Sequence, residues 1–189
     1  VVRSERMSGV QASWGFSLAE NNAAIQTGVS GVGYQNSGYV DYVSGPLYAG
    51  IGVDHTTSNP SGANASEGQR LAIATAWYDF GVVKPILSIT RAKLGVATGV
   101  LDSNVASLGM TAPLFGGELK ALVAQVNQSG PNAQDLTKFG VGYHYFLKRV
   151  RTGTESYSTK LYVDAATSKA SNPTKTRAKA VDVGVMVAF

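Results

Sequence analysis

The last nine residues constrain the fold of this chain more than any other feature. They read Val181-Asp-Val-Gly-Val-Met-Val-Ala-Phe189, so every second residue is a valine or the closing phenylalanine. Because successive side chains of a β-strand point to opposite faces, one face of this strand is wholly apolar and the other is small or mixed. Such a strand suits either the lipid-facing wall of a membrane β-barrel or the buried last strand of a soluble β-sandwich.

The amino-acid composition excludes several classes of protein. The chain has 189 residues and no cysteine, which excludes a disulfide framework, thiolate metal sites and a cysteine nucleophile. The hydrophobic fraction is 44%, yet no apolar run approaches the length of a membrane helix, so a helical membrane protein is excluded. The net charge of +4 is too small to indicate a nucleic-acid partner.

Segments of about ten residues alternate with polar connections rich in Gly, Ser, Asn, Thr and Pro. Ten strands are predicted, at 7–16, 32–43, 47–56, 69–79, 82–93, 103–112, 118–127, 137–146, 155–166 and 180–189. Short connections are predicted at 44–46, 79–81, 113–117 and 147–153, and long ones at 19–31, 57–68, 94–102, 128–136 and 168–178. Transmembrane barrels pair short periplasmic turns with long extracellular loops, so this rhythm favours an all-β, antiparallel transmembrane β-barrel over a sandwich. Tyrosines near predicted strand ends are typical of an interfacial aromatic girdle: Tyr42, Tyr78, Tyr143 and Tyr145.

Four ordered motifs resemble a known family. Gly38-Tyr-Val-Asp-Tyr-Val-Ser-Gly-Pro-Leu47, Tyr78-Asp-Phe-Gly-Val-Val-Lys84 and Phe139-Gly-Val-Gly-Tyr-His-Tyr-Phe-Leu-Lys-Arg149 are similar to hairpins and strands of the general porins of β-proteobacteria. The tail from Val183 resembles their last strand and the signal that the barrel-assembly machinery reads. On this resemblance, Val181, Val183, Val185, Val187 and Phe189 form the membrane-assembly tail.

The resemblance implies a sixteen-stranded trimeric diffusion channel in a Gram-negative outer membrane, with no cofactor. Residues 1–189 are then a single β-barrel domain or its carboxy-terminal part, because such porins are nearly twice this length. Two departures stand out. Leu147-Lys-Arg-Val-Arg-Thr152 replaces the family's Ser-Lys-Arg-Thr run, and Met186 stands where a basic residue is usual. The amino-terminal strands and the inward-folded third loop have no counterpart in the sequence.

Basic residues are the candidates for the channel lining, because a pore selects ions through the charges along its wall. The predicted pore-lining residues are Lys84, Lys120, Arg70, Arg91 and Lys93. Lysine at the lipid-facing midplane costs about 2–4 kcal/mol, so Lys84 and Lys120 are expected to face the lumen. The others lie nearer strand ends, where they could instead reach an interface. A second cluster is predicted at the outer mouth: Lys169, Lys175, Arg177 and Lys179. Together these residues predict weak anion selectivity, although the loop cluster could equally be solvated or bind phosphates of surface lipid.

Two other functions remain open at this point. One is a small, complete ten-stranded barrel with a structural or adhesive role. The other is a barrel hydrolase using Asp54 and His55, but adjacent residues of a strand point to opposite faces and cannot easily pair. The chain contains no Gly-x-Ser-x-Gly, HExxH or P-loop pattern, so no enzyme and no metal site is predicted.

Overall fold

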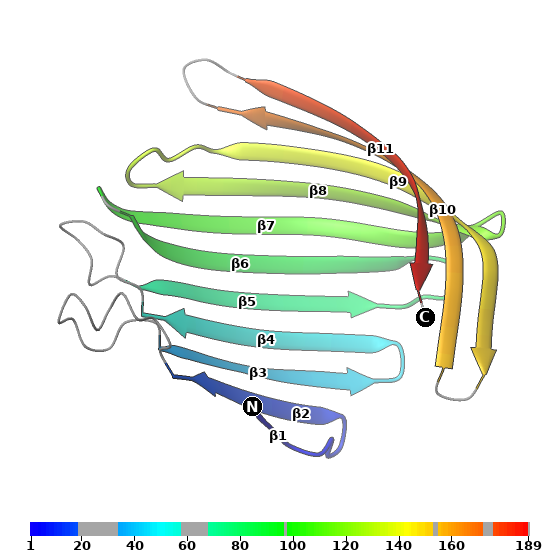
Figure 1. The fold of residues 1–189 in the computed structure, drawn as a ribbon, viewed down its shortest axis with the longest axis horizontal. Coiled ribbons are helices and arrows are strands. Elements are labelled where there is room, and N and C mark those ends of the chain that lie inside the picture. The colour runs from blue at the N-terminus through cyan, green and yellow to red at the C-terminus, as the bar shows by residue number, and fades with distance from the viewer. Residues whose placement is uncertain (19–33, 58–67, 97, 153–154, 172–175, 189) are drawn as a thin grey trace.

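Antiparallel strands build the whole of the described fold. The computed structural model describes residues 1–18, 34–57, 68–96, 98–152, 155–171 and 176–188. The strands are β1 (Val2–Arg3), β2 (Val10–Ser17), β3 (Gln35–Ser44), β4 (Leu47–Thr56), β5 (Gln69–Tyr78), β6 (Lys84–Val96), β7 (Gly99–Leu114), β8 (Gly117–Ser129), β9 (Leu136–Thr152), β10 (Glu155–Ala170) and β11 (Arg177–Ala188). Each strand pairs with the next in sequence, so the sheet is a simple up-and-down meander (Figure 1). No helix in this part of the chain has the length and apolarity needed to cross a membrane.

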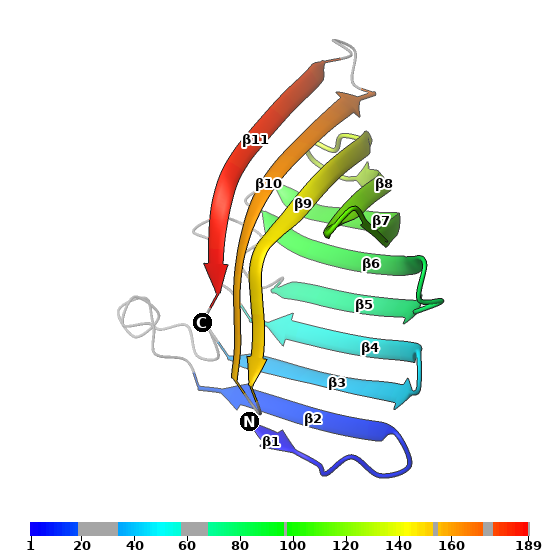
Figure 2. The same cartoon turned by 90° about the vertical axis from the view of Figure 1, so that its right-hand side faces the viewer.

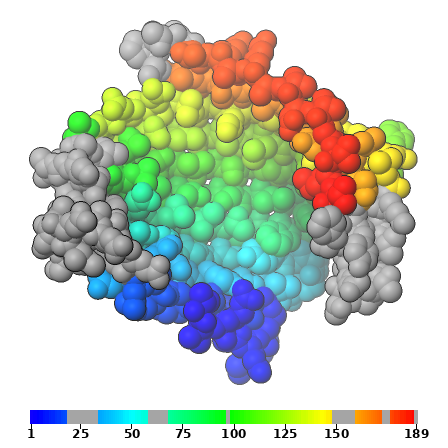
Figure 3. Space-filling model, viewed as in Figure 1, coloured from blue at the N-terminus to red at the C-terminus, as the bar shows by residue number. Residues whose placement is uncertain are grey.

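The sheet is strongly curved, and it is open in the described residues, because β1 and β11 are its two unpaired edges. Seen from the side, β11 and the β9–β10 hairpin arch over the strands from β3 to β7 (Figure 2). The space-filling view looks into the resulting trough, whose floor is formed by the middle strands (Figure 3). A register shift between Thr159 and Lys160 accompanies the bend of the β9–β10 hairpin.

The ladder register divides the side chains into two contrasting faces. Directly paired residues share a face, so one face can be followed from Val183 through Val163, Tyr143 and Leu119 to Ala112. We call this the apolar face, because it also carries Leu87, Ile51 and the valines of the tail. The opposite side, which we call the polar face, carries mostly Ser, Thr, Gln, Lys, Asp and Tyr side chains. The segregation of the two faces is the pattern of a barrel wall between lipid and water.

The polar face is the inner, concave one. Apolar-face residues such as Ile51, Ile89 and Val183 are 60%, 55% and 72% exposed, as on the outside of a curved wall. On the polar face, by contrast, side chains crowd the glycines. A Cβ on Gly184 would lie 2.5 Å from the Tyr162 hydroxyl, and one on Gly50 would lie 2.8 Å from the Tyr48 hydroxyl.

The predicted strand 47–56 coincides with β4, the predicted strand 7–16 begins at Val10 as β2, and the other eight differ from the structure in where they begin or end. The short edge strand β1 was not predicted. The predicted long connection at 94–102 is wrong: β6 ends at Val96 and β7 begins at Gly99, which leaves a two-residue connection. Leu94 pairs with Leu101 and Lys93 with Asp102, so ladder pairing extends through residues whose polar composition resembled a loop.

Candidate functional site

One transverse row of the polar face carries four charged side chains. The row crosses six neighbouring strands through direct pairing: Lys84, Thr111, Lys120, Gly142, Asp164 and Asp182. The two lysines lie on β6 and β8, and the two aspartates on β10 and β11. The row therefore has a basic half and an acidic half, side by side on the concave wall.

Every carboxylate on the polar face of the described strands is held by a partner. Asp41 accepts a hydrogen bond from Arg6 at 2.6 Å, and Asp54 accepts one from Gln35 at 2.8 Å. The ammonium of Lys120 lies 3.3 Å from a carboxylate oxygen of Glu118. These contacts leave the acidic groups anchored to the wall.

The last two carboxylates join a small cluster on β9, β10 and β11. His144 Nε2 lies 3.1 Å from Asp164 Oδ1, and the Tyr162 hydroxyl donates to Asp182 at 3.1 Å. The His144 and Tyr162 rings are 5.6 Å apart. The cluster fits because Gly142 and Gly184 lie opposite Asp164 and Tyr162 in the ladder and leave room for the larger side chains. This cluster was not predicted from the sequence. Its only signal there is the short spacing of Gly142 from His144, followed by Asp164 and Tyr162 in the next segment.

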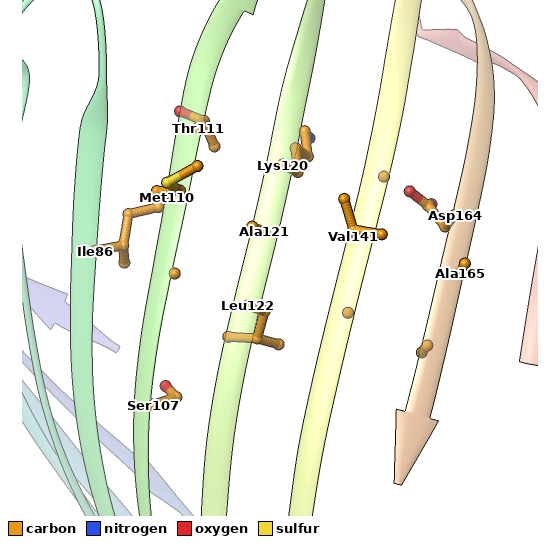
Figure 4. A pocket seen from close by; sticks show the side chains of 14 residues that line it. Ile86, Ser107, Met110, Thr111, Lys120, Ala121, Leu122, Val141, Asp164 and Ala165 are labelled. Atoms are coloured by element: carbon orange, nitrogen blue, oxygen red, sulfur yellow. The ribbon is translucent and has the colours of Figure 1, made fainter. Parts of the chain in front are cut away.

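A hollow of about 450 Å³ lies beside the row (Figure 4). Lys120, Thr111 and Asp164 contribute polar groups to its lining, and Leu122 and Ile86 contribute apolar ones. Two inward positions of its wall are the glycines Gly109 and Gly140, where an added Cβ would have its nearest neighbours at 3.5 Å and 3.7 Å. Missing side chains on a concave face leave space that water or a small solute can enter.

Aromatic rings form a second feature of the polar face that was not predicted from the sequence. Tyr48 and Trp77 are directly paired on β4 and β5, and their rings stack with centroids 3.6 Å apart at an angle of 8°. The sequence of β5 alone could not orient this strand, because both of its faces carry apolar residues. The register with β4 decides the orientation of β5. Ala72, Ala74 and Ala76 lie on the apolar face, and Trp77 lies on the polar face.

The five predicted pore-lining residues do not share one face. Lys84 and Lys120 lie on the polar face. Arg70, Arg91 and Lys93 lie on the apolar face, near the strand ends where β4 leads to β5 and β6 to β7. Arg91 and Lys93 contact Asp102 at 3.2 Å and 3.6 Å. The structure therefore separates these three residues from Lys84 and Lys120.

The predicted mouth cluster and tail also lie on the apolar face. Lys169 pairs directly with Arg177, and Lys179 follows two residues later on β11, whereas Lys175 falls outside the described residues. Val181, Val183, Val185 and Val187 continue the same face toward the end of the chain, and Phe189 is again outside the described part.

The Asp54–His55 pair is divided by the strand. Asp54 pairs with Ser37 on the polar face and His55 with Arg70 on the apolar one, as alternation along a strand requires. Among the described residues, no three His, Asp or Glu side chains are grouped closely enough to hold a metal ion. The pair offers no catalytic geometry.

Comparison with protein families agrees with this architecture. The sequence model of the Gram-negative porin family matches residues 4–173, which is most of the chain. The protein belongs to the Gram-negative porin family. No curated protein sequence matches it. Membership of this family places the porin in the outer membrane as a channel for diffusion, with small solutes passing along one face of the wall and lipid contacting the other.

The two faces of the porin can now be assigned. The apolar face meets lipid, and the polar face lines the aqueous path. Tyr42, Tyr78, Tyr143 and Tyr145 all lie on the lipid-facing side toward the short turns, where an interfacial girdle is expected. Tyr143 also donates to the Leu114 carbonyl at 2.9 Å and ties this border to the β7–β8 turn.

Proposed function

We propose that this porin is a general diffusion pore for small hydrophilic solutes and ions, with weak anion selectivity. The observation that carries the proposal is the separation of faces: charges and hydroxyls extend along the concave wall, whereas the convex wall is apolar except near the strand ends. A hydrated solute then meets hydrogen-bonding groups along its whole path, and no specific pocket is needed for passage.

The selectivity is weak because the charges of the polar face balance. Among the strand residues whose side chains the structure describes, this face carries five basic residues and five acidic ones. The basic residues are Arg3, Lys84, Lys120, Lys138 and Lys160, and the acidic ones are Asp41, Asp54, Glu118, Asp164 and Asp182. A wall without net charge attracts neither sign strongly.

The preference for anions rests on how the two signs are held. All five carboxylates accept hydrogen bonds or ion pairs from the wall, as described above. Lys84, Lys138 and Lys160 form no ion pair with the described residues, so their ammonium groups are freer to attract an anion. Lys84 lies in the central row together with Lys120, which is paired with Glu118 but remains partly exposed. These two lysines are therefore proposed as the residues that set the preference.

We also propose that the porin is a homotrimer inserted by the barrel-assembly machinery. The resemblance to β-proteobacterial general porins supports the trimer, and the alternating valines of β11 support recognition of the tail. A small complete barrel with an adhesive role is not favoured, because an adhesin does not need a balanced row of charges on its inner wall. A hydrolase is not favoured either, because Asp54 and His55 point to opposite faces.

The test is conductance in a planar lipid bilayer under a salt gradient. The expected result is stepwise openings in groups of three and a small, anion-directed reversal potential. The Lys84→Gln and Lys120→Gln double variant should move this potential to zero or to the cation side. The matched control, Arg91→Gln with Lys93→Gln, removes the same charge from the lipid-facing side and should leave the potential unchanged.

Each outcome has a clear meaning. A silent bilayer from folded protein would contradict a diffusion pore. An anion-directed potential that survives the loss of Lys84 and Lys120 would remove these two residues from the selectivity mechanism. A cation-directed potential in the native protein would show that the carboxylates dominate despite their partners.

A further inference from the structure

The cluster around His144 contains one polar atom without a partner. The His144 ring is buried on the inner wall, and its Nε2 atom lies 3.1 Å from the Asp164 carboxylate. Its other nitrogen, Nδ1, is also buried and has no hydrogen-bond partner among the described residues. Buried polar atoms are nearly always paired, so this exception needs a physical explanation.

The protonation state of His144 accounts for the unpartnered nitrogen. A carboxylate only accepts hydrogen bonds, so the contact with Asp164 places the proton of the neutral imidazole on Nε2. Nδ1 is then a bare acceptor. When the ring takes up a second proton, Nδ1 becomes a charged donor, and such a donor is costly to bury without an acceptor. A protonated His144 therefore needs a second carboxylate.

Glu118 is the carboxylate within reach. It is the direct partner of His144 in the β8–β9 ladder, and the Cβ atoms of directly opposed residues are about 4.5–5.5 Å apart. In the structure its carboxylate lies instead 3.3 Å from the ammonium of Lys120, two residues along the same strand. Both side chains of this ion pair are partly exposed, so the pair is weak and Glu118 can exchange partners at little cost.

The other groups around His144 do not offer this exchange. On the polar face, β8, β10 and β11 carry five other charged or titratable side chains that the structure describes: Lys120, Lys160, Tyr162, Asp164 and Asp182. The two lysines repel a protonated imidazole. The Asp164 carboxylate is already bound to Nε2, and the Tyr162 hydroxyl donates to Asp182. Glu118 is the acceptor that remains among the described side chains of these strands.

We propose that His144 is a proton-sensitive determinant of the ion selectivity of this pore. Protonation of His144 transfers the Glu118 carboxylate from Lys120 to Nδ1, and the released Lys120 ammonium then attracts anions. The positive charge gained by the ring acts in the same direction, so both effects raise the anion preference as the pH falls. The proposal rests on the proposed diffusion pore and adds the regulation of its selectivity.

The test follows the reversal potential in a planar bilayer, under one salt gradient, between about pH 8 and about pH 5.5, where histidine side chains ordinarily change charge. We expect the anion-to-cation permeability ratio of the native porin to rise about twofold or more over this range. His144→Gln should keep the ratio constant. The matched control is His55→Gln, which removes the only other histidine of the chain, on the lipid-facing side, and should keep the native rise.

Two further variants test the transfer of Glu118. Lys120→Gln removes the group that is released, so it should lose about half of the native rise and keep the part due to the ring charge. Glu118→Gln frees Lys120 at every pH, so its ratio should already be raised at the alkaline end and should rise less on acidification. Both positions are partly exposed, so these variants also guard against misfolding of His144→Gln.

A second measurement does not depend on conductance. In porin with isotope-labelled histidine, nuclear magnetic resonance reports the Nδ1 atom of His144, and the His55→Gln background leaves no other histidine. At the acidic end of the range, Glu118→Gln should shift the Nδ1 resonance, because the acceptor changes from a carboxylate to an amide.

Three results would overturn the proposal. They are a constant permeability ratio from an open native channel, a native rise that survives His144→Gln, and a full native rise in Lys120→Gln. An Nδ1 resonance that does not respond to Glu118→Gln would exclude the transfer as well. A bilayer that is silent at every pH contradicts the diffusion pore itself, and the His144 resonance then still decides whether Glu118 moves.

Discussion

His144 Nε2 lies 3.1 Å from Asp164 Oδ1 across the β9–β10 ladder, where the His144 side chain is buried and the Asp164 side chain is 44% exposed. The Nε2 atom of His144 therefore lies on the inner wall of the porin, beside the Asp164 carboxylate. The contact ties a charged residue of the central row to the neighbouring strand.

This contact should contribute to stability. His144→Gln and Asp164→Asn should each lower the free energy of unfolding by about 1 kcal/mol, since the pair is partly solvated. The double variant should cost less than the sum of the two single variants, because both remove the same interaction. Urea unfolding of the porin in lipid vesicles measures all three. Strict additivity would mean that the pair does not interact.

Gly142 is expected to be sensitive to substitution, because a Cβ at this position would run into the Asp164 carboxylate. Gly142→Ala should destabilise the porin by about 1–3 kcal/mol through displacement of that side chain. Gly109→Ala is the matched control, since its nearest neighbour would lie at an ordinary 3.5 Å. The effect of Gly142→Ala should shrink in the His144→Gln background, where Asp164 is free to move. Equal effects at Gly142 and Gly109 would contradict this packing.

The two tryptophans report on the two faces. Trp14 lies on the apolar face and Trp77 on the polar face, and the chain has no other tryptophan. In the Trp77→Phe variant, the remaining Trp14 should be quenched strongly by lipids with brominated chains and weakly by aqueous iodide. The Trp14→Phe variant should show the reverse. Similar quenching of both residues by iodide would argue against the assignment of the faces.

Adjacent positions of β6 should respond differently to a new charge. Leu87 lies on the lipid-facing side and Ser88 on the polar one. Leu87→Lys should cost about 2–4 kcal/mol, because the ammonium enters the hydrocarbon region, whereas Ser88→Lys should cost less than about 1 kcal/mol. Unfolding in urea and the fraction of protein inserted into vesicles measure the difference. A smaller penalty at Leu87 would place this level of the strand outside the membrane.

Sequence periodicity was enough to predict the strands and the orientation of those with one apolar and one polar set. In β8, alternation alone separates Glu118 and Lys120 from Leu119, Ala121 and Val123, and the register agrees. It was not enough for β5, where alanines face lipid and larger residues, including Ile73 and Trp77, face inward. Polarity does not distinguish those two sets, and only pairing with β4 and β6 does.

The candidate site depended still more on tertiary structure. Lys84 and Lys120 were identified as basic residues within strands, but the sequence could not show that they share a row with Asp164 and Asp182. Likewise, Arg91 and Lys93 were candidates for the lining because they are basic residues near the end of a predicted strand, whereas pairing with β7 puts them on the lipid-facing side.

The class of this protein can be assigned from its amino-acid sequence, because alternation with a period of two and a ten-residue rhythm of turns are local properties of the chain. Tertiary structure alone decided which charges face the pore and which face lipid. The physical reason is that a shift of one residue in strand register moves every side chain to the other face, and register is set by contacts between residues that are far apart in sequence.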